Sequence, residues 1–454
     1  MSSRSRKIPP LFTHQKADVE FELKNEKVFD TSEPGTGKTR TRLEVFSKRR
    51  AKGGKCVLVI SPKSLLRSAW EADAKTFTPW LKVSCAYAEN RDKAFREKAD
   101  LYVTNHDATK WLAKQDPQFF DKFDSLIVDE SGAYKHHTSD RSKALTKIKK
   151  YFKYRVCMNG TPNPRSITDV WNQINILDDG ERLGKSFFGF RNATQAPIQV
   201  GKLPHFVKWE DKAGSEAAVS SLIKDITIRH TLDECHDIPA NHNYVVPFYM
   251  TQKLQKAYDE MEATAKLRLR DGEVNAVNAA SVVTKLLQIA SGAVYEDSEH
   301  YHLIDTARYE LIGDLVEERK NSVVFFIWKH QKDMLIEELK KRKITYTLLD
   351  GSVTDRKKLA NVQHFQAGFY RVVLAHPQSA AHGLTLTKGT STIWASPTYN
   401  LEHWIQGNKR IHRAGQKEKT ETVNLIAEGT IEEHVYNVLC MKKGKLIDML
   451  EALG

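Results

Sequence analysis

The sequence predicts an α/β protein made of two lobes, each built on a parallel β-sheet and each carrying a helical insertion. Two observations carry this prediction. Short apolar runs of strand length alternate with helical patterns in the first half of the chain, and the same rhythm returns in the second half. Such alternation implies parallel sheets covered on both faces. Ligands of such sheets lie beyond the carboxyl ends of the strands, and the polar signature residues of this chain follow the apolar runs.

The first lobe is expected over residues 1–235, with its helical insertion at about 165–225. Val28 and Phe29 lie just before a glycine-rich loop and predict a strand, and the apolar residues at 43–46 after the loop predict a helix. Further runs of strand length occupy 56–60, 101–106, 125–130 and 155–162.

The second lobe is expected over residues 236–454, with its helical insertion at about 250–300. It lacks a glycine-rich Gly-Lys-Thr loop. A long helical pattern covers 252–292, the stretch 237–241 is typical of a linker, and Thr430-Ile-Glu-Glu433 predicts the capped start of the last helix. The strand-length runs lie at 323–327, 344–349, 371–375, 392–395 and 422–426.

Composition is that of a soluble globular protein. The chain has 454 residues, of which 40% are hydrophobic and 28% charged, and no apolar run approaches the roughly 20 residues of a membrane span. The basic N-terminus leads into Ile8-Pro-Pro and does not resemble a secretory signal. The 5 cysteines are scattered without a Cys-x-x-Cys pair, which predicts reduced thiols in a cytoplasmic protein without a zinc site.

The charge balance predicts an anionic partner. Lys and Arg number 70 against 57 for Asp and Glu, a formal net charge of +13. This excess suits a partner with a phosphate backbone, and a solvated basic surface is the alternative interpretation.

The stretch from Asp30 to Thr39 predicts a phosphate-binding loop for ATP. Gly35, Thr36 and Gly37 bring backbone N–H groups close to phosphate oxygens, Lys38 reaches the β- and γ-phosphates, and the Thr39 hydroxyl holds Mg²⁺. Ser32 stands at the place of the first glycine of the pattern. The alternative is a glycine-rich turn beside a chance lysine.

Three further residues of the first lobe belong to the predicted chemistry. Gln15 lies just upstream of the loop, and its amide suits adenine; alone, it is equally a surface residue. Asp129, after the apolar run 126–128, is expected to hold Mg²⁺, and Glu130 to activate the attacking water. An acidic loop without a catalytic role is the alternative there.

In the second lobe, the segment from Gln406 to Arg413 is expected to supply catalytic residues. Arg410 and Arg413 are three residues apart, so on a helix they share a face, and guanidinium groups suit phosphoryl oxygens. A solvated basic helix is the alternative.

Taken together, these motifs resemble superfamily 2 helicase-type motors of the Swi/Snf branch, in a compact form similar to those of phages and bacteria. The resemblance covers nearly the whole chain. It rests on blocks quoted in order along the sequence: Ser61-Pro-Lys-Ser-Leu-Leu with Trp70, Val128-Asp-Glu130, Asn159-Gly-Thr-Pro162, Ile228-Arg229, Leu349-Asp-Gly-Ser352, Gly383-Leu-Thr-Leu386 and Arg410-Ile-His-Arg-Ala-Gly-Gln416.

The resemblance implies two RecA-like lobes with an ATP cleft between them, and DNA bound across both. It implies DNA-backbone contacts at Pro62, Lys63, Ser64, Thr104, Asn105, Thr161, Lys329, His382 and Gly383, with Gly383 also among the nucleotide-binding residues. Such contacts carry no sequence information, so little sequence specificity is expected. For Trp394, Tyr399 and Trp404, packing against the sheet is the favoured interpretation and stacking on bases the alternative.

The acidic motif departs from the family pattern. It is Asp129-Glu130-Ser131-Gly132 where the family has Asp-Glu-x-His, so the residue that often links ATP to the rest of the cleft is absent or replaced.

The function expected from the resemblance is that of an ATP-dependent DNA translocase on duplex or branched DNA, acting in fork remodelling or branch migration during replication, recombination or repair. Replication or recombination proteins are the expected further partners, and the cytoplasm of a bacterial host is the expected location. Three alternatives remain: a translocase that displaces proteins from DNA, an RNA helicase, which should carry Ser-Ala-Thr in place of the Gly-Thr-Pro block, and a DNA-binding scaffold with an inactive ATP site.

Overall fold

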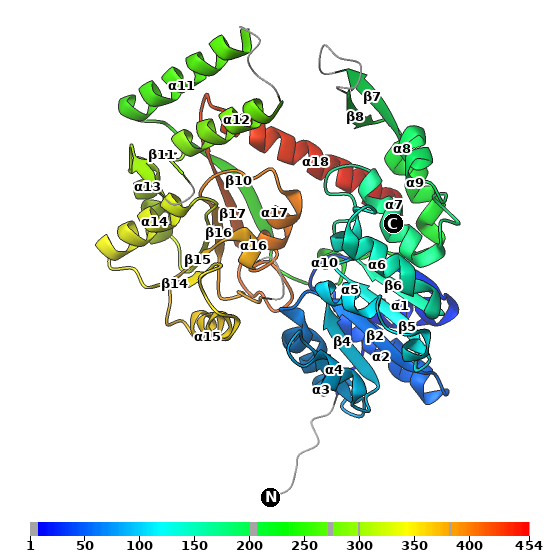
Figure 1. The fold of residues 1–454 in the computed structure, drawn as a ribbon. Coiled ribbons are helices and arrows are strands. Elements are labelled where there is room, and N and C mark those ends of the chain that lie inside the picture. The colour runs from blue at the N-terminus through cyan, green and yellow to red at the C-terminus, as the bar shows by residue number, and fades with distance from the viewer. Residues whose placement is uncertain are drawn as a thin grey trace, which may run out of the picture. The chain divides into compact units, whose positions relative to one another are not determined.

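The computed structural model describes residues 8–199, 207–235, 237–270, 276–297, 300–380 and 384–453. The chain divides into two compact lobes. The first comprises Met1–Asp237 together with Lys442–Gly454, and the second comprises Ile238–Met441. Each lobe contains a parallel sheet flanked by helices, which confirms the predicted fold class (Figure 1).

The first lobe has a seven-stranded sheet in the order β3-β4-β2-β5-β6-β1-β9, and every pairing is parallel. Its strands are β1 (Lys27–Asp30), β2 (Cys56–Ser61), β3 (Val83–Ala86), β4 (Leu101–Asn105), β5 (Phe123–Asp129), β6 (Tyr154–Met158) and β9 (Thr227–Ile228). Its helices are α1 (Thr13–Lys24), α2 (Lys38–Ala51), α3 (Ala72–Phe77), α4 (Arg91–Arg96), α5 (Thr109–Leu112), α6 (Asp140–Ile148), α7 (Thr168–Asp178), α8 (Phe187–Thr194), α9 (Ser215–Ile223) and α10 (Leu232–Cys235).

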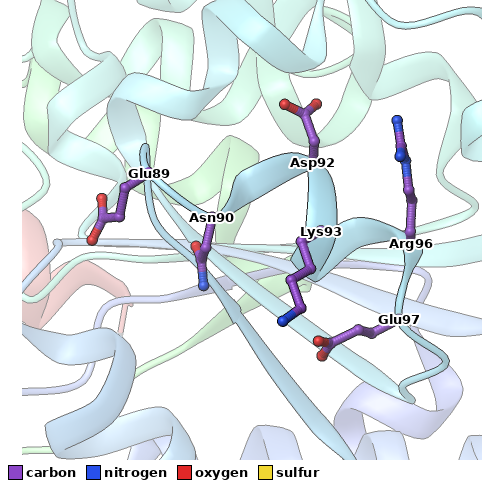
Figure 2. A pocket seen from close by; sticks show the side chains of 6 residues that line it. All are labelled: Glu89, Asn90, Asp92, Lys93, Arg96 and Glu97. Carbon is purple, nitrogen blue, oxygen red and sulfur yellow. The ribbon is translucent and has the colours of Figure 1, made fainter.

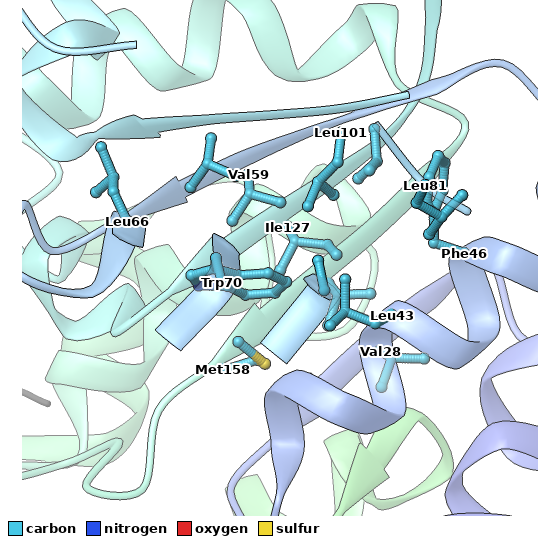
Figure 3. Close-up of a cluster of buried hydrophobic side chains, with 14 of the residues drawn as sticks. Val28, Leu43, Phe46, Val59, Leu66, Trp70, Leu81, Leu101, Ile127 and Met158 are labelled. Carbon is cyan, nitrogen blue, oxygen red and sulfur yellow. The ribbon is translucent and has the colours of Figure 1, made fainter. Parts of the chain in front are cut away.

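One face of this sheet is covered by the helix that follows the phosphate loop. Val57 and Val59 of β2 point into a buried cluster with Leu43 of α2 and Trp70, which precedes α3 (Figure 3). Side chains alternate along a strand, so the equally buried Leu58 faces the other side of the sheet. Both faces are therefore apolar, as a sheet between two helical layers requires.

The second lobe has a six-stranded sheet in the order β10-β17-β16-β13-β15-β14, again parallel throughout. Its strands are β10 (Asn241–Phe248), β13 (Ser322–Phe325), β14 (Tyr346–Leu349), β15 (Val372–Ala375), β16 (Ser391–Trp394) and β17 (Thr420–Ala427). Its helices are α11 (Gln252–Arg270), α12 (Ala276–Ala290), α13 (Ala307–Glu317), α14 (Lys329–Lys341), α15 (Asp355–Gln366), α16 (Pro377–Ala380), α17 (Leu401–Asn408) and α18 (Ile431–Leu453), which ends in the first lobe.

The strands predicted from apolar runs are present in both sheets, but the sequence did not predict three others. β3 and β9 are short, and β10 is largely exposed along its length. Each insertion also contains a hairpin that the helical expectation lacked: β7 (Gln195–Gln199) with β8 (Val207–Asp211), and β11 (Ala293–Tyr295) with β12 (Tyr301–Leu303). Strands that are short or largely exposed carry little apolar periodicity, which explains why the sequence did not reveal them.

The end of α18 belongs to the first lobe, whereas the sequence-based division placed all of 236–454 in the second. Leu446, Met449 and Leu450 are buried. Ser220 of α9 donates a hydrogen bond to the Met449 carbonyl at 2.9 Å, and Lys445 pairs with Asp211 at 3.3 Å. The last turns of α18 therefore pack against the insertion of the first lobe. None of the helices in the described part of the chain is long and apolar enough to cross a bilayer.

Candidate active site

The phosphate loop joins the carboxyl end of β1 to the start of α2. Gly35 and Gly37 have φ values of 97° and 85°, in the left-handed region that favours glycine. The Lys38 ammonium donates hydrogen bonds to the carbonyls of Ser32 at 2.5 Å and Glu33 at 3.0 Å. The backbone of the loop therefore has the shape that points the N–H groups at the start of a helix toward an anion, and Lys38 lies against this loop.

Helix α1 supports the loop from one side. The Gln15 amide donates to the Gly37 carbonyl at 3.4 Å and accepts from the Phe12 N–H at 3.1 Å. The His14 ring donates to the Thr36 carbonyl at 2.8 Å. A methyl group at Gly37 would lie 2.3 Å from Gln15 Nε2, so glycine is required here for close packing as well as for φ. The predicted residue Gln15 thus lies directly against the loop.

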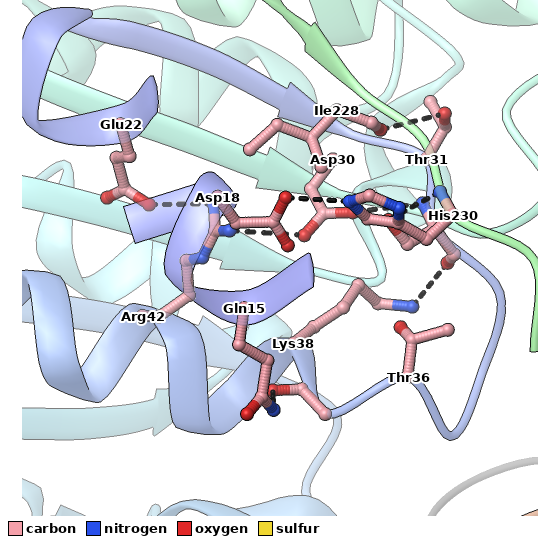
Figure 4. A network of polar contacts seen from close by, with 12 residues as sticks. Gln15, Asp18, Glu22, Asp30, Thr31, Thr36, Lys38, Arg42, Ile228 and His230 are labelled. Atoms are coloured by element: carbon pink, nitrogen blue, oxygen red, sulfur yellow. Dashed lines mark hydrogen bonds and ion pairs between the residues drawn. The ribbon is translucent and has the colours of Figure 1, made fainter. Parts of the chain in front are cut away.

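The segment after β9 supports the loop from the other side (Figure 4). The Thr31 and Glu33 N–H groups donate to the carbonyls of Ile228 at 2.8 Å and His230 at 2.9 Å. The His230 N–H in turn donates to the Ser32 hydroxyl at 3.1 Å. Ser32, which departs from the glycine of the phosphate-loop pattern, therefore provides an acceptor that glycine lacks.

This contact predicts that Ser32→Gly weakens ATP binding, although glycine is the residue that the pattern favours. One neutral hydrogen bond contributes about 0.5–1.5 kcal/mol, so the KM for ATP should rise about two- to tenfold. Ser32→Ala should behave similarly, and steady-state kinetics measure both. An unchanged or lower KM in Ser32→Gly would show that the hydroxyl does not hold the loop.

Buried charges anchor the base of the loop (Figure 4). Arg42 of α2 is fully buried and pairs with Glu22 of α1 at 2.7 Å and with Asp30 of β1 at 3.3 Å. Burial raises the pKa of Glu22, although Arg42 opposes this effect. Asp18 and His230 form a second pair at 2.8 Å, and the hydrogen bond that the His230 ring donates to Asp18 raises the pKa of His230. The Arg42 pairs therefore join α2 to α1 and to β1. Removing one partner of such a buried pair would leave an uncompensated charge.

The acidic pair lies at the carboxyl end of β5, two strands from β1. Asp129 is 8% exposed, and its Oδ2 accepts from the Ser61 hydroxyl at 2.9 Å and from the Trp70 indole at 3.0 Å. Burial raises the pKa of Asp129, and these hydrogen bonds and the Lys38 charge lower it. Asp30 of β1 and Asp129 of β5 both pair with Met158 of β6, so the phosphate loop and the acidic motif follow strands that end at the same edge of the sheet.

Glu130 has an unusual backbone. Its φ of 51° is in the left-handed region, which costs a non-glycine residue energy and occurs often at functional sites. Its side chain is partly exposed, unlike that of Asp129. The ring of His106, after β4, donates to the Asp129 carbonyl at 2.8 Å. Burial lowers the pKa of His106 to about 4, so this ring is neutral and fixes the turn without adding charge.

The donor set fits Mg²⁺ held partly by substrate. In the described part of the chain, no three His, Cys, Asp or Glu side chains gather as a metal cage. Mg²⁺ is usually bound by one or two protein oxygens together with waters and phosphate oxygens. The Asp129 carboxylate and the Thr39 hydroxyl are ligands of that kind.

In the second lobe, Arg410 and Arg413 share one hydrogen-bond acceptor, the carbonyl of Leu384. Arg410 donates to the carbonyls of Gln406 at 2.9 Å and Leu384 at 3.2 Å, and Arg413 donates to Leu384 at 3.0 Å. The buried Gln406 Oε1 has no hydrogen-bond partner among the described residues.

The expectation that the two arginines share a helix face is wrong. Helix α17 ends at Asn408, and both arginines lie in the turns that follow. The Arg410 N–H bonds the Gly407 carbonyl in place of the helical partner four residues back, which closes the helix. Arg410 is 5% exposed and Arg413 more so. Arg410 is therefore placed to support the loop, and Arg413 is better placed to meet a ligand.

The candidate DNA-facing residues divide by exposure. Lys63, Ser64 and Lys329 are exposed, and Asn105 is partly exposed. The expected DNA-backbone contact at Thr104 is corrected by the structure. Its strand lies inside the sheet, so Thr104 is fully buried and donates to the Ala86 carbonyl at 2.9 Å. Pro62 and Thr161 are also buried. His382 and Gly383 lie outside the described residues.

The aromatic residues of the second lobe support packing. Trp394 and Trp404 are buried, and their indoles donate to Asn408 at 2.9 Å and Asn424 at 3.0 Å. Tyr399 is 37% exposed.

An open pocket on the first lobe is lined by residues other than those predicted to bind ATP (Figure 2). It is lined by Glu89, Asn90, Asp92, Lys93, Arg96 and Glu97, none of which is expected to hold ATP. This pocket is therefore not part of the candidate active site.

Sequence reasoning missed three supporting residues of the site: His106, Gln173 and His230. Gln173 is fully buried within α7, among apolar neighbours such as Val170 and Ile174. A polar residue inside an apolar helical stripe was the available signal, because buried amides require partners.

Two models of known families match successive parts of the chain. The model of the SNF2-related domain matches residues 14–293, which span the phosphate loop, the acidic motif and the first insertion. The chain belongs to the SNF2-related family. The helicase conserved C-terminal domain matches residues 306–415, so this SNF2-related protein is a helicase-type ATPase with both motor lobes.

Relatives of this SNF2-related chain include proteins of very different length. It is 26% identical to protein p41 of Acyrthosiphon pisum secondary endosymbiont phage 1, covering 92% of this chain and 93% of that protein. It is 24% identical to the SWI/SNF-related matrix-associated actin-dependent regulator of chromatin subfamily A-like protein 1 homolog of Caenorhabditis elegans, covering 96% of this chain and 61% of that protein. The solved SWI2/SNF2 ATPase core of Sulfolobus solfataricus in complex with dsDNA is 20% identical over 97% of this chain and 93% of that one, with a TM-score of 0.46.

Proposed function

We propose that this protein is an ATP-driven translocase on duplex or branched DNA. The observation that carries the proposal is that the phosphate loop after β1 and Asp129-Glu130 at the end of β5 lie at the same edge of one sheet, in a chain of the SNF2-related family. ATP hydrolysis can drive movement of one lobe relative to another. The second helicase lobe supplies the second moving part that such a motor needs.

Each residue has a chemical role in this proposal. The loop N–H groups and Lys38 hold the phosphates, and Gln15 reads adenine. Thr39 and Asp129 would hold Mg²⁺, which supplies charge neutralisation at the β- and γ-oxygens. Glu130 takes the proton of the attacking water, and its partial exposure leaves that carboxylate accessible. Arg413 stabilises charge that develops on the γ-phosphate.

The preference for DNA rests on charge and on motif chemistry. The net charge is +13, and Lys63, Ser64 and Lys329 are exposed where backbone contacts are expected. The Asn159-Gly-Thr-Pro162 block differs from the Ser-Ala-Thr that an RNA helicase should carry. Forks or branched junctions are the proposed substrates, and displacement of proteins from DNA, which would use the same motor, is the second candidate.

A DNA-dependence assay tests the proposal. Duplex DNA should raise the steady-state ATPase rate at saturating ATP, and unrelated sequences of the same shape should act equally. Duplex RNA of the same length is the control, since an RNA helicase would respond to it. An ATPase rate that no DNA structure changes would contradict the proposal.

Binding should weaken steeply with salt. Neutralisation of phosphates releases counterions, so log K should fall linearly with log salt at a slope of about −0.9 per contact. Lys63→Ala and Lys329→Ala should each reduce the slope by about one, and fluorescence anisotropy at several salt concentrations measures this. A flat salt response, or a strong preference for one sequence, would refute backbone recognition.

A further inference from the structure

The loop that follows Glu130 is held by the buried glutamine of α7. Gln173 Oε1 accepts hydrogen bonds from the Ser131 hydroxyl at 2.7 Å and from Asn159 Nδ2 at 2.8 Å. Gln173 Nε2 donates to the carbonyls of Pro162 at 2.8 Å and Asp169 at 2.9 Å. An amide offers two acceptor positions and two N–H donors, and all four are used here, which fixes its orientation.

Asn159 extends this connection to the phosphate loop. Its N–H donates to the Asp30 carbonyl at 2.9 Å, and its Oδ1 accepts from the Thr161 N–H at 3.1 Å. A methyl group at the next residue, Gly160, would lie 3.2 Å from Pro34 and 3.3 Å from the Ser32 carbonyl. The Gly-Thr-Pro loop therefore packs directly on the phosphate loop.

Gly132 leaves room for this arrangement. A methyl group at Gly132 would lie 2.9 Å from Asn159 Nδ2, which Gln173 already holds in place. The histidine of the family pattern would belong at this position. Here its side chain could enter only by displacing Asn159.

We propose that Gln173 is a positioning residue for ATP hydrolysis. It fixes the acidic loop against the Gly-Thr-Pro loop and, through Asn159, against the phosphate loop. The connection that the family makes through its histidine runs through Ser131, Gln173 and Asn159 in this chain. The inference rests on the proposed role of Glu130 as general base.

The size of the effect follows from geometry. Ser131 is adjacent to Glu130, so release of its hydroxyl frees the base to move. Misplacement of a catalytic group by about 1 Å costs on the order of 10²-fold in rate. Substrate binding depends on the phosphate loop, which keeps its own supports from α1 and from the segment after β9. The loss should therefore fall on kcat and spare KM.

Ser131→Ala tests this first, because it removes one hydroxyl and should leave the fold intact. We expect kcat to fall about tenfold or more with the KM for ATP within twofold. The matched control is Ser220→Ala, which removes another fully buried hydroxyl with a 2.9 Å hydrogen bond, far along the chain in α9. The control should lower the melting temperature similarly and keep kcat. Equal kcat in wild type and Ser131→Ala would overturn the proposal.

A double-mutant cycle isolates the contact. Burial raises the pKa of the Cys157 thiol and the Ser131 hydroxyl opposes this rise, so the single variant alone does not separate the effect of Ser131 on Cys157 from its contact with Gln173. If Ser131 acts through Gln173, Ser131→Ala combined with Gln173→Leu should cost no more in kcat than Gln173→Leu alone. Multiplicative losses in the double variant would show that the two residues act independently, against the proposal.

Gly132→His gives the opposite prediction from the family pattern. We expect it to lower kcat, because the new side chain displaces Asn159, and Gly132→Ala should lower kcat less. Higher turnover in Gly132→His would show that histidine is the missing link and that Gln173 is not. Normal turnover in Glu130→Gln would instead show that Glu130 is not the general base. Failure of the proposed function and failure of the Gln173 proposal are therefore distinguishable.

Discussion

Glu130→Gln is expected to lower turnover by about 10³-fold while ATP stays bound with near-normal affinity. General-base catalysis contributes about 10²–10⁴-fold, and glutamine has nearly the same shape but cannot take a proton at neutral pH. The left-handed backbone places this side chain at the end of β5, next to an Asp129 that is held by Ser61 and Trp70. The substitution should therefore remove chemistry and leave the site intact.

Single-turnover kinetics and equilibrium binding of a fluorescent ATP analogue measure the two effects separately. Glu89→Gln, at a surface pocket without predicted nucleotide residues, is the matched control and should keep wild-type kcat. Lys38→Ala should differ from Glu130→Gln by losing nucleotide binding as well as turnover. A Glu130→Gln variant with normal turnover would refute the assignment of the base.

Arg413→Ala is expected to lower kcat by about 10³-fold with ATP affinity within a few-fold of wild type. An arginine that acts on the transferred phosphoryl group is worth about 10³–10⁵ in rate. Because the charge that it stabilises develops in the transition state, its loss falls on kcat. Arg413 is the more exposed of the two arginines that bond the Leu384 carbonyl.

Two comparisons separate this role from that of a basic surface. Lys417→Ala removes an exposed cation a few residues away and should affect DNA affinity alone. Arg410→Ala removes a buried guanidinium bonded to two carbonyls and should lower the melting temperature as well as kcat. If Arg413→Ala hydrolyses ATP normally at saturating DNA and only binds DNA more weakly, the catalytic role is wrong.

The sequence predicted the parts of the fold that apolar burial determines. The runs at 56–60 and 125–130 became the neighbouring strands β2 and β5 because strands buried on both faces are apolar throughout. The tight loop between β1 and α2 was predictable from its glycines, because Gly35 and Gly37 adopt backbone angles that other residues avoid.

Features that depend on tertiary contacts were not predictable in this way. β10 is exposed along most of its length and is defined by its pairing with β17. Thr104 lies in a motif expected to face DNA, yet its position in the sheet buries it. Gln173 acquires its role only when the loops after β5 and β6 meet α7, and no spacing along the chain encodes that meeting.

The most direct measurement of the central claim is displacement of a triplex-forming third strand from a DNA duplex. A protein that moves along duplex DNA must remove the third strand in its path, whereas one that only binds or only hydrolyses ATP need not. Wild-type protein with ATP should release the labelled strand, at the same rate for unrelated flanking sequences, and Glu130→Gln should release none. Vigorous DNA-stimulated hydrolysis without strand release would contradict translocation.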